Sequence, residues 1–163
     1  MDLQKDISLP ADPAAVLRLW LNPAFHERRC EAAHAVHYEV SVDPDGATTA
    51  PATVTTSRAL PTDRLPDLVR SFVGQTLTLV ERIEWTDAKS AAVHVRVEGA
   101  PITLTGAYAL GPGPDGGSRL AVRAEVKATV PLVGGKIEKM VLPVMQSALD
   151  ADERLAREAL TAR

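Results

Sequence analysis

The chain has 163 residues, of which 45% are hydrophobic, 24% charged and only 4% aromatic, with a formal net charge of -3 at pH 7. This composition argues against disorder, and the length suits a single domain over residues 1–163. Charges of both signs are interspersed, and basic pairs such as Arg28-Arg29 are interpreted as a solvated helix face. The charge therefore argues against nucleic acid as a partner, because phosphate binding needs a basic surface.

The single cysteine, Cys30, excludes an internal disulfide and a zinc site built from several cysteines. The N-terminal residues lack the apolar core of a secretory signal, and no apolar run approaches the ~20 residues that a membrane-spanning helix requires. We therefore expect a cytoplasmic protein with no membrane span, no metal and no cofactor.

The beginning of the chain predicts a strand and two short helices. Apolar and polar residues alternate from Leu3 to Leu9, as expected of a strand. Asp12-Pro13 and Asn22-Pro23 each place a capping side chain before a proline, which is typical of a helix start. The second helix should end near Ala33.

Beyond the helices a period of two predicts six further strands. They are expected from His34 to Val42, through Ala52 to Thr56, from Thr76 to Trp85, from Val93 to Glu98, from Ile102 to Leu110 and from Leu120 to Val130. Pro51 suggests an edge position for the second of these, residues 61–74 a connection with one short helix, and residues 111–117 an irregular surface loop. The one-sided alternation predicts an antiparallel sheet with one buried face.

The remainder of the chain predicts a long helix after Gly134-Gly135. An apolar stripe at helical spacing marks its expected buried face, formed by Ile137, Met140, Val141, Val144, Ala148, Leu155 and Ala159. Pro143 lies inside this stripe and should bend the helix without ending it. Asp150 and Asp152 fall on the face expected to be exposed.

This order of elements resembles the helix-grip fold of the START-like (SRPBCC, Bet v-like) superfamily. Residues 22–28 (NPAFHER) resemble its second-helix segment, and residues 130–138 (VPLVGGKIE) resemble the strand-to-helix corner of an uncharacterised branch of it. The resemblance covers nearly the whole chain. It implies an α+β fold in which a curved antiparallel sheet of seven strands wraps around the C-terminal helix, with a ligand cavity between them.

Glu81 is the most informative single residue. Strict alternation places it with Leu79 and Ile83 on the face expected to be buried, where an ionised carboxylate needs a partner, a raised pKa or a wet cavity. The alternative is a β-bulge that turns Glu81 outward. The same register turns Arg58 inward. A carboxylate facing a cavity would orient a ligand or transfer a proton, and Glu81→Leu is then expected to alter ligand binding without loss of stability.

The histidines give no clear metal site. His34 and His37 are three residues apart, which on a strand sends them to opposite faces, and His94 lies among charged residues of an outer face. His26 is interpreted as a partly exposed helix residue, with a ligand contact at the cavity mouth as the alternative. Cys30 is one helical turn from His26, so a nucleophilic pair is the alternative to a buried inert cysteine.

Three functions remain open, and no catalytic residue is assigned. The first is binding of a hydrophobic small molecule (a lipid, an isoprenoid or a polyketide) between the sheet and the C-terminal helix. The second is a cyclase- or dehydratase-type enzyme that uses Glu81 or His26 in the same cavity. The third is a protein-interaction domain with a closed core and an apolar surface near residues 65–72. The pocket residues expected for the first function are Trp20, Tyr38, Leu79, Glu81, Ile83, Trp85, Val95, Leu104, Tyr108, Val126, Ile137, Met140 and Val144.

Overall fold

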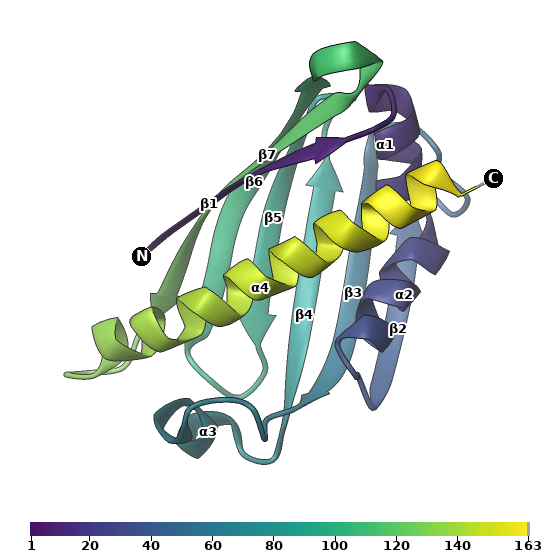
Figure 1. Ribbon diagram of the computed structural model, residues 1–163. Helices are drawn as coiled ribbons and strands as arrows, with labels where there is room; N and C mark the ends of the chain where they lie inside the picture. Colours follow the sequence, from purple (N-terminus) through teal and green to yellow (C-terminus); the bar gives the residue numbers. More distant parts are fainter. Residues whose placement is uncertain (163) are drawn as a thin grey trace.

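A computed structural model describes residues 1–162, and Arg163 lies outside the described residues. One antiparallel sheet of seven strands curves around a long C-terminal helix, which crosses its inner face (Figure 1). The elements in chain order are β1 (Asp2–Leu9), α1 (Pro13–Trp20), α2 (Pro23–Ala32), β2 (His37–Asp43), β3 (Ala52–Pro61), α3 (Asp67–Val73), β4 (Thr76–Trp85), β5 (Ser90–Val97), β6 (Ile102–Pro112), the 3-10 turn η1 (Pro114–Gly116), β7 (Ser118–Ala128) and α4 (Gly134–Thr161).

The strand order is β1-β7-β6-β5-β4-β3-β2, so the sheet is open and β1 and β2 form its two edges. Each strand from β2 to β7 pairs with its neighbour in sequence, whereas β1 pairs with β7 at the far end of the chain. The predicted seven-stranded antiparallel sheet, the two short helices after its first strand and the long final helix are all confirmed.

The two early helices begin where the sequence predicts, because each has a side-chain cap. The Ala15 N–H donates to Oδ1 of Asp12 at 2.8 Å, and the Ala24 N–H donates to Oδ1 of Asn22 at 3.0 Å. A proline follows each cap, where its missing N–H costs no helical hydrogen bond. These local signals set where α1 and α2 begin, whereas the buried residues of both helices stabilise them by packing against the rest of the fold.

The start of β2 differs from the prediction. His34 adopts a left-handed conformation (φ 60°) after α2, so the chain turns there and the strand begins only at His37. Val36, which the alternation places on the same strand face as Tyr38, Val40 and Val42, lies before the strand and is 71% exposed. The alternation of the sequence therefore continues through the turn at His34, and alternation by itself does not show where a strand begins.

Two further strand predictions were wrong. β3 pairs with both β2 and β4 and is not an edge strand, because Pro51 precedes Ala52 and therefore removes no hydrogen bond from the ladder. β6 continues to Pro112, which pairs with Ser118, and η1 occupies part of the expected irregular loop.

The core lies between the inner face of the sheet and the helices α1, α2 and α4. Its largest buried side chains are Trp20, Trp85 and Phe25, surrounded by aliphatic residues. Gly106 of β6 is necessary for the close approach to β7, because an added Cβ would lie 2.2 Å from the carbonyl oxygen of Arg123.

The buried line of α4 departs from the predicted stripe after Val141. It continues through Met145, Leu149, Asp152 and Ala156, at a spacing of three or four residues. Val144 is 43% exposed and Ala148 is exposed, so their inward placement was wrong, as was the outward placement of Asp152. The helix continues through Pro143 as predicted. Among the helices of residues 1–162, none combines the length and apolarity needed to cross a membrane.

Candidate functional site

The centre of the molecule holds a charged cluster formed by Arg29, Glu81 and Asp152. Arg29 belongs to the face of α2 that also buries Phe25, His26 and Cys30 at a spacing of three or four residues. Arg29 is 5% exposed, whereas its neighbour Arg28 lies at the surface. The interpretation of Arg28-Arg29 as a solvated pair was therefore wrong for Arg29.

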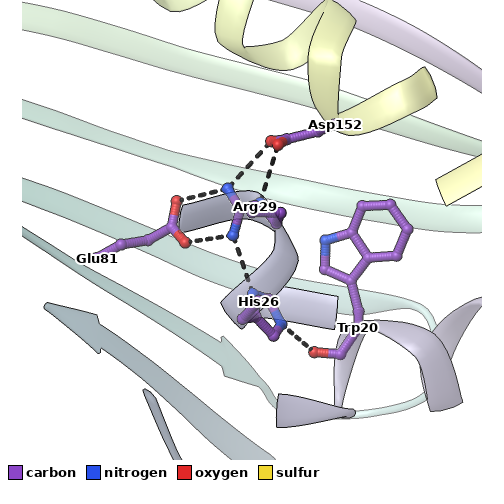
Figure 2. Close-up of polar contacts among 5 residues, drawn as sticks. All are labelled: Trp20, His26, Arg29, Glu81 and Asp152. Atoms are coloured by element: carbon purple, nitrogen blue, oxygen red, sulfur yellow. Dashed lines mark hydrogen bonds and ion pairs between the residues drawn. The ribbon is translucent and has the colours of Figure 1, made fainter. Parts of the chain in front are cut away.

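Arg29 binds two carboxylates at once, each through two hydrogen bonds (Figure 2). Nη1 and Nη2 donate to Oε1 and Oε2 of Glu81 at 2.8 and 3.2 Å. Nε and Nη2 donate to Oδ1 and Oδ2 of Asp152 at 2.9 and 3.0 Å. The planar guanidinium thus binds one carboxylate through Nη1 and Nη2 and the other through Nε and Nη2, so the Arg29 side chain joins α2, β4 and α4.

His26 completes the cluster in its neutral form. Its Nδ1 accepts a hydrogen bond from Nη1 of Arg29 at 2.9 Å, so the ring proton lies on Nε2, which donates to the carbonyl oxygen of Trp20 at 2.7 Å. Burial and the Arg29 cation lower the pKa of His26 to about 4. His26 is fully buried, and its interpretation as a partly exposed residue was wrong.

Glu81 is ionised despite its burial. Burial by itself raises the pKa of a carboxyl, but the nearby Arg29 and Arg58 cations outweigh this effect and lower the pKa of Glu81 to about 2. The inward position expected for Glu81 is therefore observed, and a β-bulge does not turn it outward: Glu81 pairs in register with Thr56 and Val95. Burial and the Glu81 charge also raise the pKa of Tyr108.

Three buried polar atoms on the inner face of the sheet have no hydrogen-bond partner within residues 1–162. They are Oγ1 of Thr56, Nε of Arg58 and Nε1 of Trp85. Thr56 and Trp85 are each 1% exposed. Buried polar groups are nearly always hydrogen-bonded, so a water molecule or a ligand would supply a partner to these atoms.

Most of the predicted pocket residues are buried or half-buried in the interior. Those that are buried are Trp20, Glu81, Ile83, Trp85, Leu104, Tyr108, Val126 and Ile137. Three are half-buried, namely Leu79, Val95 and Met140. The two outliers are Tyr38, half-exposed with its hydroxyl donating to Glu31 at 2.9 Å, and the exposed Val144.

Cys30 is fully buried. Burial raises the pKa of its thiol, and the opposing effect of the Arg58 and Arg29 cations is smaller. Both ring nitrogens of His26 are already hydrogen-bonded, so His26 has no free nitrogen to act as a base for the thiol. The geometry thus favours the inert buried cysteine over the nucleophilic pair.

Two surface hollows lie outside the interior. One is lined by Glu39, Ser41 and neighbouring residues of β2 and β3, and the other by residues 127–135 at the corner between β7 and α4. Within residues 1–162, no three His, Cys, Asp or Glu side chains gather as a metal site requires.

The two residues that sequence reasoning missed are Arg29 and Asp152. Arg29 is three residues after His26 and one before Cys30, so a helical face through these residues was available as a signal. Asp152 continues the spacing of Val141, Met145 and Leu149. Neither signal reveals that the two residues meet, because they are 123 positions apart.

The chain is similar to proteins without an assigned activity. A family described as "Protein of unknown function (DUF2505)" matches residues 5–160. The uncharacterized protein Rv0481c of Mycobacterium tuberculosis is 26% identical over 106 residues, which cover 62% of this chain and 61% of that protein. The match thus spans less than two thirds of the length of this relative.

Solved structures share the fold over nearly the whole chain. TTHA0849 from Thermus thermophilus superposes with a TM-score of 0.67 at 18% identity, covering 98% of this chain and 97% of that one. A START superfamily protein from Mycobacterium smegmatis gives 0.63 at 10% identity (98% and 99% covered), and the Zhui aromatase/cyclase from Streptomyces sp. R1128 gives 0.63 at 9% identity (98% and 93% covered). These likenesses confirm the START-like helix-grip fold.

Proposed function

The chain belongs to the DUF2505 family, and we propose that it binds a small apolar molecule between the sheet and α4, at the end of the interior next to α3. The observation that carries this proposal is a change of burial along the inner face of β3 and β4. Ala52 and Val54 of β3 are buried, and so are Ile83 and Trp85 of β4. Toward α3, the inward residues become half-buried while remaining mostly apolar.

The half-buried residues define the expected contact surface. Leu77 and Leu79 of β4 face inward, and Leu60 pairs with Leu77 across the two strands. Met140 of α4 is half-buried against the same core. An apolar face that is incompletely covered by the protein favours contact with an apolar ligand.

The charged cluster lies next to the half-buried apolar residues, between them and the aromatic core. Arg29 connects α2, β4 and α4 at the level of Glu81, so a ligand seated beside Leu79 would meet the cluster and not the aromatic core around Trp85. Such an arrangement gives a ligand one apolar end and one polar end. Few polar groups in an apolar site are sufficient to orient a small molecule.

The helix α3 is the element expected to control access, because it lies beyond the ends of β3 and β4 (Figure 1). This helix has seven residues, lacks a side-chain cap and buries only Val69. A short helix with few buried contacts opens at low free-energy cost, so it is suited to uncover a site.

Binding is favoured over catalysis by the state of the two candidate proton donors. Both nitrogens of His26 are hydrogen-bonded within the protein, and Glu81 is ionised with both oxygens held by Arg29. Neither group is free to exchange a proton with a ligand near pH 7. The aromatase/cyclase named among the structural neighbours shares the fold alone.

The proposal is tested with Nile red, a neutral apolar dye, and by native mass spectrometry of the purified protein. We expect saturable dye binding that Leu79→Trp weakens at least tenfold, because the larger side chain fills the space beside Glu81. Thr105→Trp on the exposed outer face of β6 is the control and should leave binding unchanged. Absence of both dye binding and a co-purifying apolar molecule would refute the proposal and favour the closed-core interaction domain.

A further inference from the structure

We propose that the ligand carries a carboxylate and that Arg58 and Thr56, on the inner face of β3, bind it. This inference rests on the proposed function, since it assigns the polar group of a ligand held at the same end of the interior. It assigns a role to two residues that the Arg29 cluster does not use.

Arg58 and Thr56 are adjacent on the inner face of one strand. They are two residues apart on β3, which places their Cα atoms roughly 7 Å from each other on the same side of the sheet. Across the sheet Arg58 pairs with Leu79, and Thr56 pairs with Glu81. They therefore lie where the half-buried apolar surface meets the charged cluster.

Thr56 is buried and Arg58 is half-buried, and each has one buried polar atom without a partner. Oγ1 of Thr56 and Nε of Arg58 are buried and have no hydrogen-bond partner, and Arg58 forms no ion pair within residues 1–162. Thr56 is itself 1% exposed. Arg58 nevertheless lies close enough to the cluster that its charge helps to lower the pKa of Glu81. An acceptor group of a ligand would satisfy both the buried Nε–H of Arg58 and the buried hydroxyl of Thr56 on this face.

The missing group must accept hydrogen bonds. A guanidinium only donates, and the threonine hydroxyl is able to donate to the same acceptor. The carboxylates of Glu81 and Asp152 do not fill this role in the structure, because they bind Arg29, and neither Nε of Arg58 nor Oγ1 of Thr56 forms a hydrogen bond with them. A ligand carboxylate has two oxygens, which match the Nε–H and one Nη–H of Arg58 in the parallel geometry that makes such pairs strong.

The apolar part of the ligand is defined by the surroundings of Arg58. Leu60 and Leu77 lie one pair further along the inner face toward α3, and Leu79 lies directly opposite Arg58. These residues are half-buried and would cover a hydrocarbon chain that starts at the carboxylate. The expected ligand class is therefore a monocarboxylic acid with an extended apolar tail.

The test compares three probes of one chain length, decanoic acid, decanol and methyl decanoate, as competitors of Nile red at pH 8. We expect the acid to bind about 10- to 100-fold more tightly than the alcohol, the range for hydrogen bonds to a charged group. Arg58→Gln should weaken binding of the acid by the same factor and binding of the alcohol by less than about threefold. Arg82→Gln, an exposed arginine on the outer face of β4, is the matched control and should leave both unchanged.

A second variant keeps the inference testable if Arg58→Gln does not fold. Thr56→Val keeps the shape of the side chain and removes only the unpaired hydroxyl, so the fold should keep or gain stability while binding of decanoic acid weakens about 3- to 10-fold. Equal affinities for the acid, alcohol and ester, or acid binding that neither Arg58→Gln nor Thr56→Val weakens, would overturn the carboxylate site and leave the proposed function intact. If Nile red itself does not bind, the proposed function fails, and the carboxylate site fails with it.

Discussion

Replacing Arg29 with methionine tests the charged cluster most directly. The variant keeps most of the side-chain length but leaves the carboxylates of Glu81 and Asp152 buried without a cation. Breaking a buried ion pair by removing one partner typically costs 3–5 kcal/mol. The depression of the Glu81 pKa from 4.5 to about 2 corresponds to roughly 3 kcal/mol, in the same range. Arg29→Met should thus lower the free energy of unfolding by about 3–5 kcal/mol, a large share of the stability of a typical domain.

Removing all three charges should have a much smaller effect. In the triple variant Arg29→Met, Glu81→Leu, Asp152→Leu no charge of the trio stays buried, and apolar replacements of buried ion clusters are often neutral or stabilising. His26 would lose the donor to its Nδ1, which costs about 1–3 kcal/mol. We therefore expect the triple variant to regain most of the stability that Arg29→Met loses.

The measurement is urea unfolding at pH 7, followed by circular dichroism, with the free energy of unfolding extrapolated to water. Arg28→Met is the matched control on the same helix, because Arg28 is exposed and pairs with Glu158 at 3.6 Å, so its loss should cost less than about 1 kcal/mol. A cost below about 1 kcal/mol for Arg29→Met, or a triple variant no more stable than the single one, would refute the buried cluster as the source of stability.

Three further outcomes follow from the same structure. Glu81→Leu alone should destabilise the protein by about 2–4 kcal/mol in urea unfolding, because Arg29 loses one of its two carboxylates. This result is contrary to the expectation from sequence, and unchanged stability would contradict the bidentate pair of Arg29 and Glu81. Burial and Arg29 lower the pKa of His26 in the folded protein, so the stability that depends on neutral His26 is fully present above pH 6.5 and is lost as the pH falls through about 4. When unfolding is measured at several pH values, the His26→Asn variant should therefore lose less stability in acid than the natural chain. Equal losses would argue against a buried, neutral His26. Gly106→Ala should lower the free energy of unfolding by at least about 2 kcal/mol, measured by heat or urea, because the added Cβ would collide with the backbone of β7. Gly111 lies on the same strand with open space beside it, so Gly111→Ala should cost little. Similar effects for both variants would contradict the close approach of β6 and β7.

Local signals in the sequence were sufficient for most of the architecture. The capping residues Asp12 and Asn22 located the two early helices, and the period of two located most of the sheet. The same signals failed where a turn interrupted a continuing pattern, as at His34, or where a proline lay just outside a strand, as at Pro51. Periodicity indicates the conformation of a segment, but it does not show where that segment ends in a turn or which strand it pairs with.

The inward position of Glu81 was also available from alternation, because successive side chains of a strand point to opposite faces. The ionisation state of Glu81 could not be predicted from the sequence, because it depends on a partner that lies on another element. Arg29 is 52 positions away in sequence, and Asp152 is 123 positions from Arg29. The helical spacing of Asp152 after Val141, Met145 and Leu149 was a signal for its inward position, but the sequence does not show that Arg29 is there to compensate its charge.

The sequence by itself determined the fold class, the order and type of the elements and the inner face of each long strand, because these depend on residues close together in the chain. Only the tertiary structure decided that Arg29 joins α2, β4 and α4, and that Oγ1 of Thr56 and Nε of Arg58 are buried without a partner. Burial of charge is stable only when compensating groups converge from different elements. That convergence is set by the packing of the sheet against α2 and α4, which is a property of the whole chain.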